Sequence, residues 1–208
     1  NTWTFSGTAT TNTSIGSVTD NAGNPNNAVQ PITNGGQTND TTPTLSGKGT
    51  PGETVTIKDG DTVVGTTTVN PDGTWSFTAP VQGEGPHSYT ASTPSGGTSA
   101  PFTFTVDTTA PKIAVSIDKT ALTSDATAIV TFTLSEASTD FVQGDVKVTG
   151  GSIGPLTQSS TNPRVYTATF TPDNVTGSTP AAASIQVESD KFSDAAGNLN
   201  KDGAEADN

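Results

Sequence analysis

Polar and apolar residues alternate along many short stretches of this chain, and turn residues separate one stretch from the next. The alternation is clearest in residues 53–57 and 164–170. A period of two buries one face of a β-strand, whereas an amphipathic helix needs a period near 3.6 residues. The pairs Asp59-Gly60 and Asp72-Gly73 fall between apolar stretches and favour tight hairpin turns. The pattern predicts an all-β protein made of many short strands.

The predicted strands divide into two blocks, residues 41–107 and residues 108–208. Each block has several short strands with frequent turns, which is typical of a β-sandwich. The second block reaches the loop at residues 194–198 and then shows no further strand pattern. A sandwich normally adds one more strand there, so we expect the second block to lack its last strand.

Residues 1–40 look like the tail of a preceding repeat followed by a linker. Residues 1–5, with Trp3, resemble the stretch around Trp75, and we expect both tryptophans to belong to a core. Half a sandwich exposes strand edges and apolar surface. This segment therefore either docks on another part of the chain or completes a domain outside it, and the sequence leaves both alternatives open.

The composition agrees with small β-domains. Hydrophobic residues make up 29% of the chain and charged residues 13%. Threonine and valine favour strands, while the unbranched helix formers are scarce. A chain with so little apolar content suits two small β-sandwiches, which need less core than one large globular domain.

Charge and cysteine content narrow the possible partners. The formal net charge of -12 repels phosphate backbones, so we expect no nucleic acid partner. The chain has no Cys, which excludes disulfides and thiolate metal sites. It has no apolar stretch of membrane-spanning length, so we expect no membrane insertion of this segment. It also has no Met, which suggests a fragment of a longer protein.

One acidic pentapeptide occurs near both ends of the chain. Asp-Asn-Ala-Gly-Asn at residues 20–24 returns as Asp-Ala-Ala-Gly-Asn at residues 194–198, and Val-Asp-Thr-Thr-Ala-Pro at residues 106–111 lies between them. These segments combine carboxylate and amide oxygens with a Gly that allows a sharp turn. They fall where one β-domain passes into the next. Such oxygen-rich loops suit a hard cation such as Ca²⁺.

Several of these motifs carry a family resemblance. Residues 39–47, 51–57 and 72–77 resemble bacterial immunoglobulin-like repeats, and residues 139–151 resemble a sister repeat type. Such repeats occur in large surface and biofilm adhesins that type I systems secrete. The resemblance covers nearly the whole chain and implies tandem immunoglobulin-like β-sandwich domains on the bacterial cell surface. It also implies neighbouring repeats as partners and Ca²⁺ at or near the domain junctions.

The second junction offers the fuller ligand set. Alternate loops of an immunoglobulin-type sandwich lie at the same end. Asp107 enters at that end of the second block, and the loops that carry Glu136 and Asp194 should lie there too. With Asn198 and backbone carbonyls, these carboxylates would supply the roughly 6–8 oxygens that Ca²⁺ prefers. Zinc is disfavoured because the chain has no Cys and only one His.

The first junction departs from this pattern. Lys48 occupies the position that corresponds to Glu136, although Asp40 remains. Asp20 and Asn24 belong to an intact pentapeptide, but the domain that it would serve is incomplete. With one or two carboxylates in place of three, we expect a weak site or none there.

No catalytic constellation is visible, and we expect no enzyme. His87 has no acidic or hydroxyl partner that suggests a triad, so we expect a partly exposed strand histidine. The sequence predicts a structural extender of a bacterial adhesin, rigidified by Ca²⁺, in which other domains contact a host-cell or biofilm ligand. Three alternatives stay open: a module that binds glycan or peptide, an accessory β-domain of a secreted polysaccharide-degrading enzyme, and head-to-tail strand exchange that uses residues 1–5.

Overall fold

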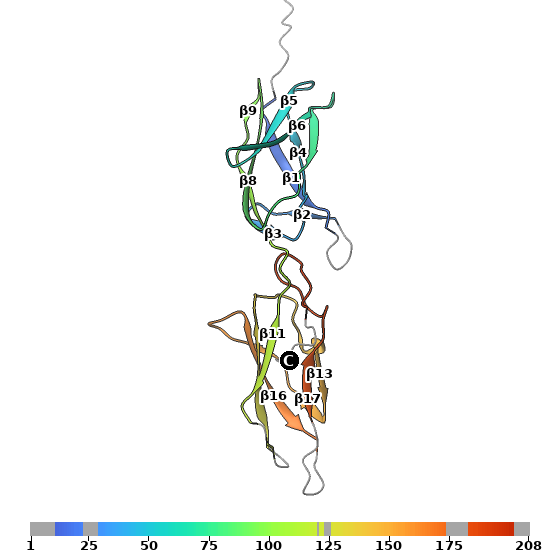
Figure 1. The fold of residues 1–208 in the computed structure, drawn as a ribbon, viewed down its shortest axis with the longest axis vertical. Helices are drawn as coiled ribbons and strands as arrows, with labels where there is room; N and C mark the ends of the chain where they lie inside the picture. Colours follow the sequence, from blue (N-terminus) through green and yellow to red (C-terminus); the bar gives the residue numbers. More distant parts are fainter. Residues whose placement is uncertain (1–10, 23–28, 120, 123–125, 174–182, 202–208) are drawn as a thin grey trace, which may run out of the picture. The chain divides into compact units, whose positions relative to one another are not determined.

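The chain folds into two β-units. A computed structural model describes residues 11–22, 29–119, 121–122, 126–173 and 183–201. It divides into one unit of residues 1–108 and another of residues 109–208, and each unit is described here by itself. Apart from one short 3-10 turn, the regular structure of the described residues consists of strands, which confirms the all-β prediction (Figure 1).

The first unit is a sandwich of two sheets (Figure 1). One sheet has the order β2-β1-β4-β7, and the other has the order β3-β10-β8-β5-β6, with β9 paired to β8. The strands are β1 (Ser14–Asp20), β2 (Gln30–Ile32), β3 (Gly36–Thr38), β4 (Thr44–Lys48), β5 (Thr54–Asp59), β6 (Thr62–Thr68), β7 (Thr74–Thr78), β8 (Gly85–Thr93), β9 (Gly97–Thr98) and β10 (Phe102–Val106). All pairs are antiparallel except β3 with β10, which run parallel.

Strand β1 shows where the N-terminal segment goes. It pairs with β4 along one edge and with β2 along the other, and Val18 is fully buried. Gly47 permits this approach, because a Cβ there would lie 1.8 Å from the backbone oxygen of Ser14 and 2.5 Å from the ring of Trp75. Of the two alternatives for residues 1–40, the described part docks on the rest of its own unit.

The core of the first unit lies between its two sheets. Trp75 is 1% exposed, as expected for a core residue, and its indole N–H donates to the Lys48 carbonyl oxygen at 3.1 Å. Trp3 lies outside the described residues. The ring of Tyr89 stacks on Phe104 with centroids 5.5 Å apart, and that of His87 stacks on the same phenylalanine at 5.7 Å. Aromatic rings thus pack together with the aliphatic residues that make up most of this core.

The second unit also has two layers of strands. One sheet has the order β11-β12-β16-β14, with β15 paired to β16, and it faces a two-stranded sheet of β13 and β17. The elements are β11 (Ile113–Ile117), β12 (Ala128–Leu134), η1 (Gln143–Asp145), β13 (Val146–Thr149), β14 (Gly151–Ile153), β15 (Thr157–Gln158), β16 (Val165–Pro172) and β17 (Ser184–Val187). Within residues 188–201, the only strand-type pairing is a bridge between Ser193 and Leu199.

The core of the second unit is built around Phe141. Its ring makes edge contacts with Phe132, Tyr166 and Phe192, at centroid distances of 5.7, 5.2 and 5.2 Å. Phe141 comes from the loop after β12, and Phe192 comes from the loop after β17. The aromatic cluster therefore fixes two loops as well as two strands.

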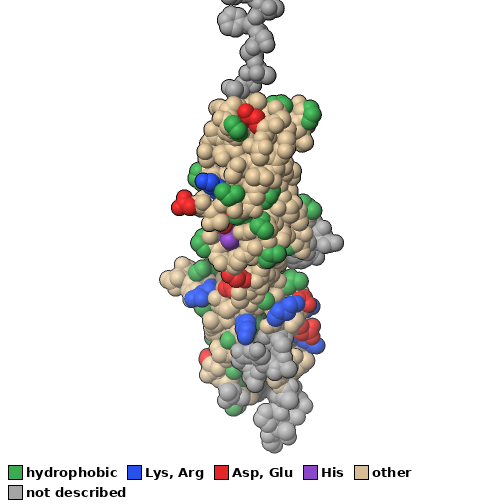
Figure 2. Space-filling model, turned by 45° about the horizontal axis from the view of Figure 1, so that its top comes forward, with side chains coloured by type: hydrophobic (Ala, Val, Ile, Leu, Met, Phe, Trp, Pro, Cys, Tyr) green, Lys and Arg blue, Asp and Glu red, His purple; other side chains and the backbone are tan. Residues whose placement is uncertain are grey.

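Serine and threonine are frequent on the strands of both units. In Figure 2, most of the visible surface of the described residues is backbone or side chains that are neither hydrophobic nor charged. Many of these hydroxyls pair across neighbouring strands. The Oγ atoms of Ser17 and Ser46 lie 2.7 Å apart, and the hydroxyls of Thr149 and Ser184 also lie 2.7 Å apart. These pairs link strands through uncharged hydrogen bonds.

We expect Tyr89→Phe to stabilise the first unit. Tyr89 is 0% exposed, and its hydroxyl has no hydrogen-bond partner among the described residues. A buried hydroxyl without a partner loses its hydration without compensation, so its removal should raise the free energy of unfolding by roughly 1 kcal/mol. Urea unfolding followed by tryptophan fluorescence measures the change, because Trp75 is buried in the core of this unit.

Tyr166→Phe is the matched control, with the opposite expected sign. The Tyr166 hydroxyl donates to the Ser138 carbonyl oxygen at 3.0 Å and accepts from the Gln158 side-chain amide at 2.9 Å. Its removal should cost about 1 kcal/mol in the second unit, which circular dichroism detects. Equal losses for both variants would contradict the difference in their surroundings.

Candidate metal centre

The loop at residues 194–198 is folded around the side chain of its first residue. Asp194 Oδ1 accepts hydrogen bonds from the backbone N–H groups of Ala196 at 2.8 Å and Asn198 at 2.9 Å. Its Oδ2 accepts from the side-chain amide of Asn198 at 2.9 Å. Gly197 has φ +91°, a left-handed conformation that glycine adopts without strain. Asp194 is 8% exposed as a residue, and these hydrogen bonds compensate the burial of its carboxylate.

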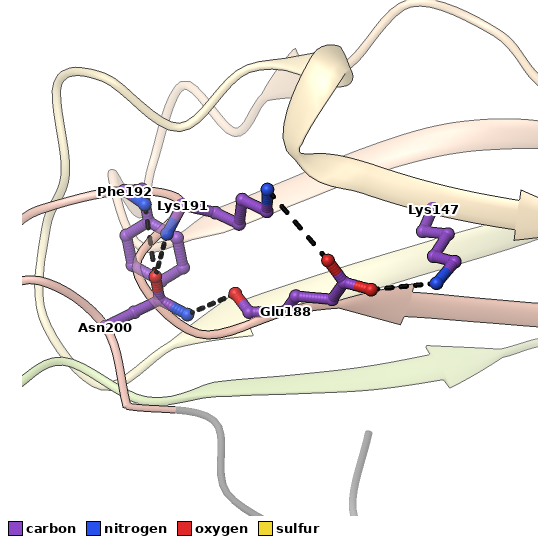
Figure 3. A network of polar contacts seen from close by, with 5 residues as sticks. All are labelled: Lys147, Glu188, Lys191, Phe192 and Asn200. Carbon is purple, nitrogen blue, oxygen red and sulfur yellow. Dashed lines mark hydrogen bonds and ion pairs between the residues drawn. The ribbon is translucent and has the colours of Figure 1, made fainter.

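Asn200 fixes the same loop from inside the domain. It is 0% exposed, and its Oδ1 accepts from the backbone N–H groups of Lys191 at 2.7 Å and Phe192 at 3.1 Å. Its side-chain amide donates to the carbonyl oxygen of Glu188 at 3.0 Å. Figure 3 shows these bonds together with the carboxylate of Glu188, which contacts Lys147 at 2.8 Å. One buried amide therefore closes the segment from residue 188 to residue 200.

Asp140 joins this loop to the loop after β12. Its carboxylate accepts from the Ser138 hydroxyl at 2.6 Å, and from the backbone N–H and hydroxyl of Ser193 at 2.8 and 2.7 Å. Partial desolvation opposes ionisation of this carboxyl, but the hydrogen bonds from Ser138 and Ser193 together outweigh it and lower the pKa of Asp140. Ser193 precedes Asp194, and Ser138 lies two residues after Glu136. The network thus holds both acid-bearing loops.

Three carboxylates come together as a group. One carboxylate oxygen each from Asp107, Glu136 and Asp194 lies within 4.8 Å of the others. Calcium–oxygen distances are about 2.3–2.6 Å, so two oxygens on opposite sides of one Ca²⁺ lie about 4.6–5.2 Å apart. The observed spacing therefore fits a shared Ca²⁺. Asp107 and Glu136 are half-buried and Asp194 is buried, so their mutual repulsion is only partly screened by water.

Asp20 and Asp40 also lie close together, but their oxygens already have donors. Asp20 accepts from the Ala22 N–H at 2.8 Å and from the Thr38 hydroxyl at 2.8 Å. Asp40 accepts from the N–H groups of Asn21 and Thr42, both at 2.7 Å. In the described part of the chain, neither joins a group of three possible metal ligands. This pair acts as an internal tie between β1 and the segment after β3.

The predicted site residues have different places in the structure. The structure brings together Asp107, Glu136 and Asp194, and it places Asn198 in the Asp194 loop as a hydrogen-bond donor. Asn24 lies outside the described residues. Asp140 and Asn200 were not predicted, because neither belongs to a recognisable motif and each acts through partners distant in the sequence.

His87 also differs from its sequence-based description. No acidic partner was expected, yet its Nδ1 lies 2.6 Å from Asp59 Oδ2. The pairing of β5 with β8 brings these residues together across 28 positions of the chain. Sequence alone does not give the register of that pairing.

Comparison with known families assigns both units. Residues 31–108 match the family described as bacterial Ig domain, and residues 107–208 match the family described as bacterial Ig-like domain. This chain belongs to the bacterial immunoglobulin-like domains. The second match starts at Asp107, so the bacterial Ig-like domain includes all three clustered carboxylates. Strand β1 precedes the first match, although the structure places it within the first unit.

The solved structures with similar folds are distant. Invasin, a bacterial integrin-binding protein, is 18% identical with a TM-score of 0.36, and the match covers 79% of this chain and 36% of that one. A glycosyl hydrolase family 2 member from Bacteroides cellulosilyticus is 14% identical with a TM-score of 0.28, covering 71% and 23% of the two chains. The chain thus spans about a third or less of the length of either protein. No curated protein sequence matches it.

The family match gives a general description of the protein. Bacterial immunoglobulin-like domains are typically non-catalytic modules of surface or extracellular proteins. None of the helical segments in the described residues is long and apolar enough to span a membrane. Two such domains follow one another here, so each has a neighbouring repeat in the same chain.

We expect Asn200→Ala to destabilise the second unit strongly. The variant loses three side-chain hydrogen bonds and leaves the N–H groups of Lys191 and buried Phe192 without their side-chain acceptor. At about 1 kcal/mol for each bond, the free energy of unfolding should fall by roughly 3 kcal/mol. Urea unfolding followed by circular dichroism measures this. Asn162→Ala, which removes one bond to the Arg164 N–H in an exposed turn, should cost less than half as much.

The Asp140 network should make the stability of the second unit depend on pH. Because the pKa of Asp140 is lower in the folded than in the unfolded chain, its contribution is present at neutral pH. It is lost as the pH falls below the usual aspartate value of about 3.9. Asp140→Asn should therefore lower the melting temperature at pH 7, and the difference from the unmodified chain should shrink as the pH is lowered through and below that value. Asp173→Asn, at an exposed position of the same unit, is the control.

Proposed function

We propose that this chain is a structural extender of a bacterial cell-surface adhesin, and that Ca²⁺ bound by Asp107, Glu136 and Asp194 stiffens the junction between its two domains. The observation that supports this is the close grouping of the three carboxylates, within 4.8 Å of one another. Tandem bacterial Ig-like domains, with no catalytic residues apparent in the sequence, suit a mechanical role. The extracellular location follows the usual setting of this family.

Charge gives the proposed mechanism. Without an ion, three half-buried or buried carboxylates repel one another, and the repulsion is relieved by moving Asp107 away from the two loops. A divalent cation attracts all three carboxylates, so its binding favours the arrangement in which they lie close together. Asp107 belongs to the connection between the domains, so holding it restricts the hinge. The residues supply only oxygen ligands, which Ca²⁺ prefers and which Zn²⁺ sites rarely consist of.

The loops around the cluster are already ordered by hydrogen bonds. Asp194 and Asn198 shape one loop, and Asp140 connects it to the loop that carries Glu136. Such outer contacts keep ligands in position, which reduces the entropy lost when an ion binds. The proposed ion therefore binds ligands that are largely in place, including Asp107, whose backbone N–H donates to the Thr38 carbonyl oxygen at 2.9 Å.

Calcium titration tests the site. Calorimetry of the chain in metal-free buffer should detect one ion at the cluster, and Glu136→Gln should weaken its binding by about tenfold or more. Glutamine keeps the size of the side chain and removes its charge. Asp61→Asn, which removes an exposed turn carboxylate, should leave the affinity unchanged. An affinity that Glu136→Gln does not alter would exclude the cluster as the site.

Small-angle scattering tests the mechanical role separately. Profiles of the chain with excess Ca²⁺ and with EGTA should differ, and the chain should be more extended and less variable with Ca²⁺. Glu136→Gln should make the two profiles alike at moderate Ca²⁺ concentration. Superimposable profiles for the unmodified chain would rule out rigidification even if an ion binds.

A further inference from the structure

The chain's single histidine has an oxygen acceptor at each ring nitrogen. His87 Nδ1 lies 2.6 Å from Asp59 Oδ2, and Nε2 lies 2.9 Å from the carbonyl oxygen of Gly83. The His87 and Asp59 side chains are 12% and 22% exposed. Asp59 is fixed in turn, because its Oδ1 accepts from the Ser88 N–H at 2.8 Å. The imidazole therefore sits in a defined place between β5 and the segment that precedes β8.

Only the protonated ring can satisfy both acceptors. Imidazolium has two N–H donors, whereas neutral imidazole has one donor and one lone pair. In the neutral ring, one nitrogen lone pair must face an oxygen lone pair. The carboxylate is the stronger acceptor, so the remaining proton stays on Nδ1 and the contact with Gly83 is lost. Loss of the proton thus acts on the segment before β8.

The other groups around the ring do not compete for this proton. Phe104 and Tyr89 pack against it, with ring centroids 5.7 and 6.4 Å away. Burial, with a smaller contribution from the charge of Asp59, raises the pKa of the Tyr89 hydroxyl, which therefore stays neutral. Asp59 and Tyr89 are the titratable side chains that face the imidazole from β5 and β8.

Residues 79–84, the segment that contains Gly83, contact Thr108, the last residue of the first unit. Glu84, the residue after Gly83, accepts hydrogen bonds from both the backbone N–H and the hydroxyl of Thr108. The register of β8 and β10 explains this contact, since Gly85 lies opposite Val106 at the ends of the two strands. Earlier in the segment, the Gln82 N–H donates to the Thr41 carbonyl oxygen at 2.7 Å. Residues 79–84 thus contact the chain just before β4 and just after β10.

We propose that the protonation state of His87 controls how residues 79–84 hold Thr108, where the connection to the second domain begins. While the ring is protonated, the imidazolium binds both Asp59 and Gly83, and Glu84 accepts hydrogen bonds from Thr108. When the ring loses one proton, the Gly83 contact is released, and the Glu84 carboxylate loses its fixed position. Histidine side chains in general change charge between pH 5 and 8, so the test covers that range. The inference is independent of the proposed Ca²⁺ site.

NMR of the full chain in EGTA tests this dependence of the Glu84–Thr108 contact on His87. The imidazole carbon protons of one histidine give an unambiguous titration curve, and long-range ¹⁵N spectra identify which ring nitrogen keeps its proton. The backbone amide signals of Glu84 and Thr108 should shift with the same midpoint as the imidazole. Above that midpoint, the remaining ring proton should reside on Nδ1.

Two variants separate the steps. His87→Gln should abolish the shifts of both amides between pH 5 and 8, which also distinguishes them from any effect of the terminal amine. Glu84→Ala should leave the amide of residue 84 responsive and abolish the response at Thr108. Glu53→Ala removes another carboxylate that accepts a hydrogen bond from a backbone N–H, that of Ser95, and should change neither response.

Three outcomes would overturn the proposal. One is a Thr108 amide that does not shift, or that shifts with a midpoint different from that of the imidazole. Another is a response at Thr108 that persists in His87→Gln or in Glu84→Ala. The third is a neutral ring protonated on Nε2, which would keep the Gly83 contact and break the one with Asp59. Because Ca²⁺ is absent throughout, none of these results depends on whether the carboxylate cluster binds an ion.

Discussion

The loops of this protein depend on hydrogen bonds from their own backbone N–H groups to Asp and Asn side-chain oxygens. In a chain with so few apolar residues, buried side chains such as Phe141 and Phe192 anchor the long loops at single points, and the rest of each loop is ordered by hydrogen bonds. Asp194, Asp140 and Asn200 each accept two or more hydrogen bonds from residues of the second unit. Buried N–H groups need such acceptors, and a side chain that supplies them fixes the loop in one conformation. The candidate metal centre lies on loops that are built this way.

The same acidic motif has two outcomes in one chain. In both places an Asp of the pentapeptide lies near an Asp that precedes a Thr-Thr pair: Asp20 with Asp40, and Asp194 with Asp107. At the first place, N–H and O–H donors satisfy the carboxylates. At the second, Glu136 brings a third carboxylate oxygen within 4.8 Å of the other two. The motif thus identifies a loop conformation, and the number of carboxylates that gather beside it differs between the two places.

Local patterns predicted the strands, but not the contacts that depend on register. The alternation at residues 53–57 and 164–170 corresponds to β5 and β16, since side-chain period is a property of the strand itself. The grouping of Asp107, Glu136 and Asp194 could be anticipated, because loop position in a sandwich follows from strand order. The contact of His87 with Asp59 could not, since it depends on which residues of β5 and β8 lie opposite each other. The docking of β1 depends likewise on the space that Gly47 leaves beside Trp75.

The hydroxyl pairs across neighbouring strands have a consequence for the conditions in which the protein works. Ion pairs on a protein surface weaken as dissolved salt screens their charges. The bonds between Ser17 and Ser46 and between Thr149 and Ser184 involve no net charge, so screening leaves them unchanged. These hydrogen bonds between strands should therefore persist from low to high ionic strength. Sensitivity to the ionic surroundings is then confined to the few places where charges gather.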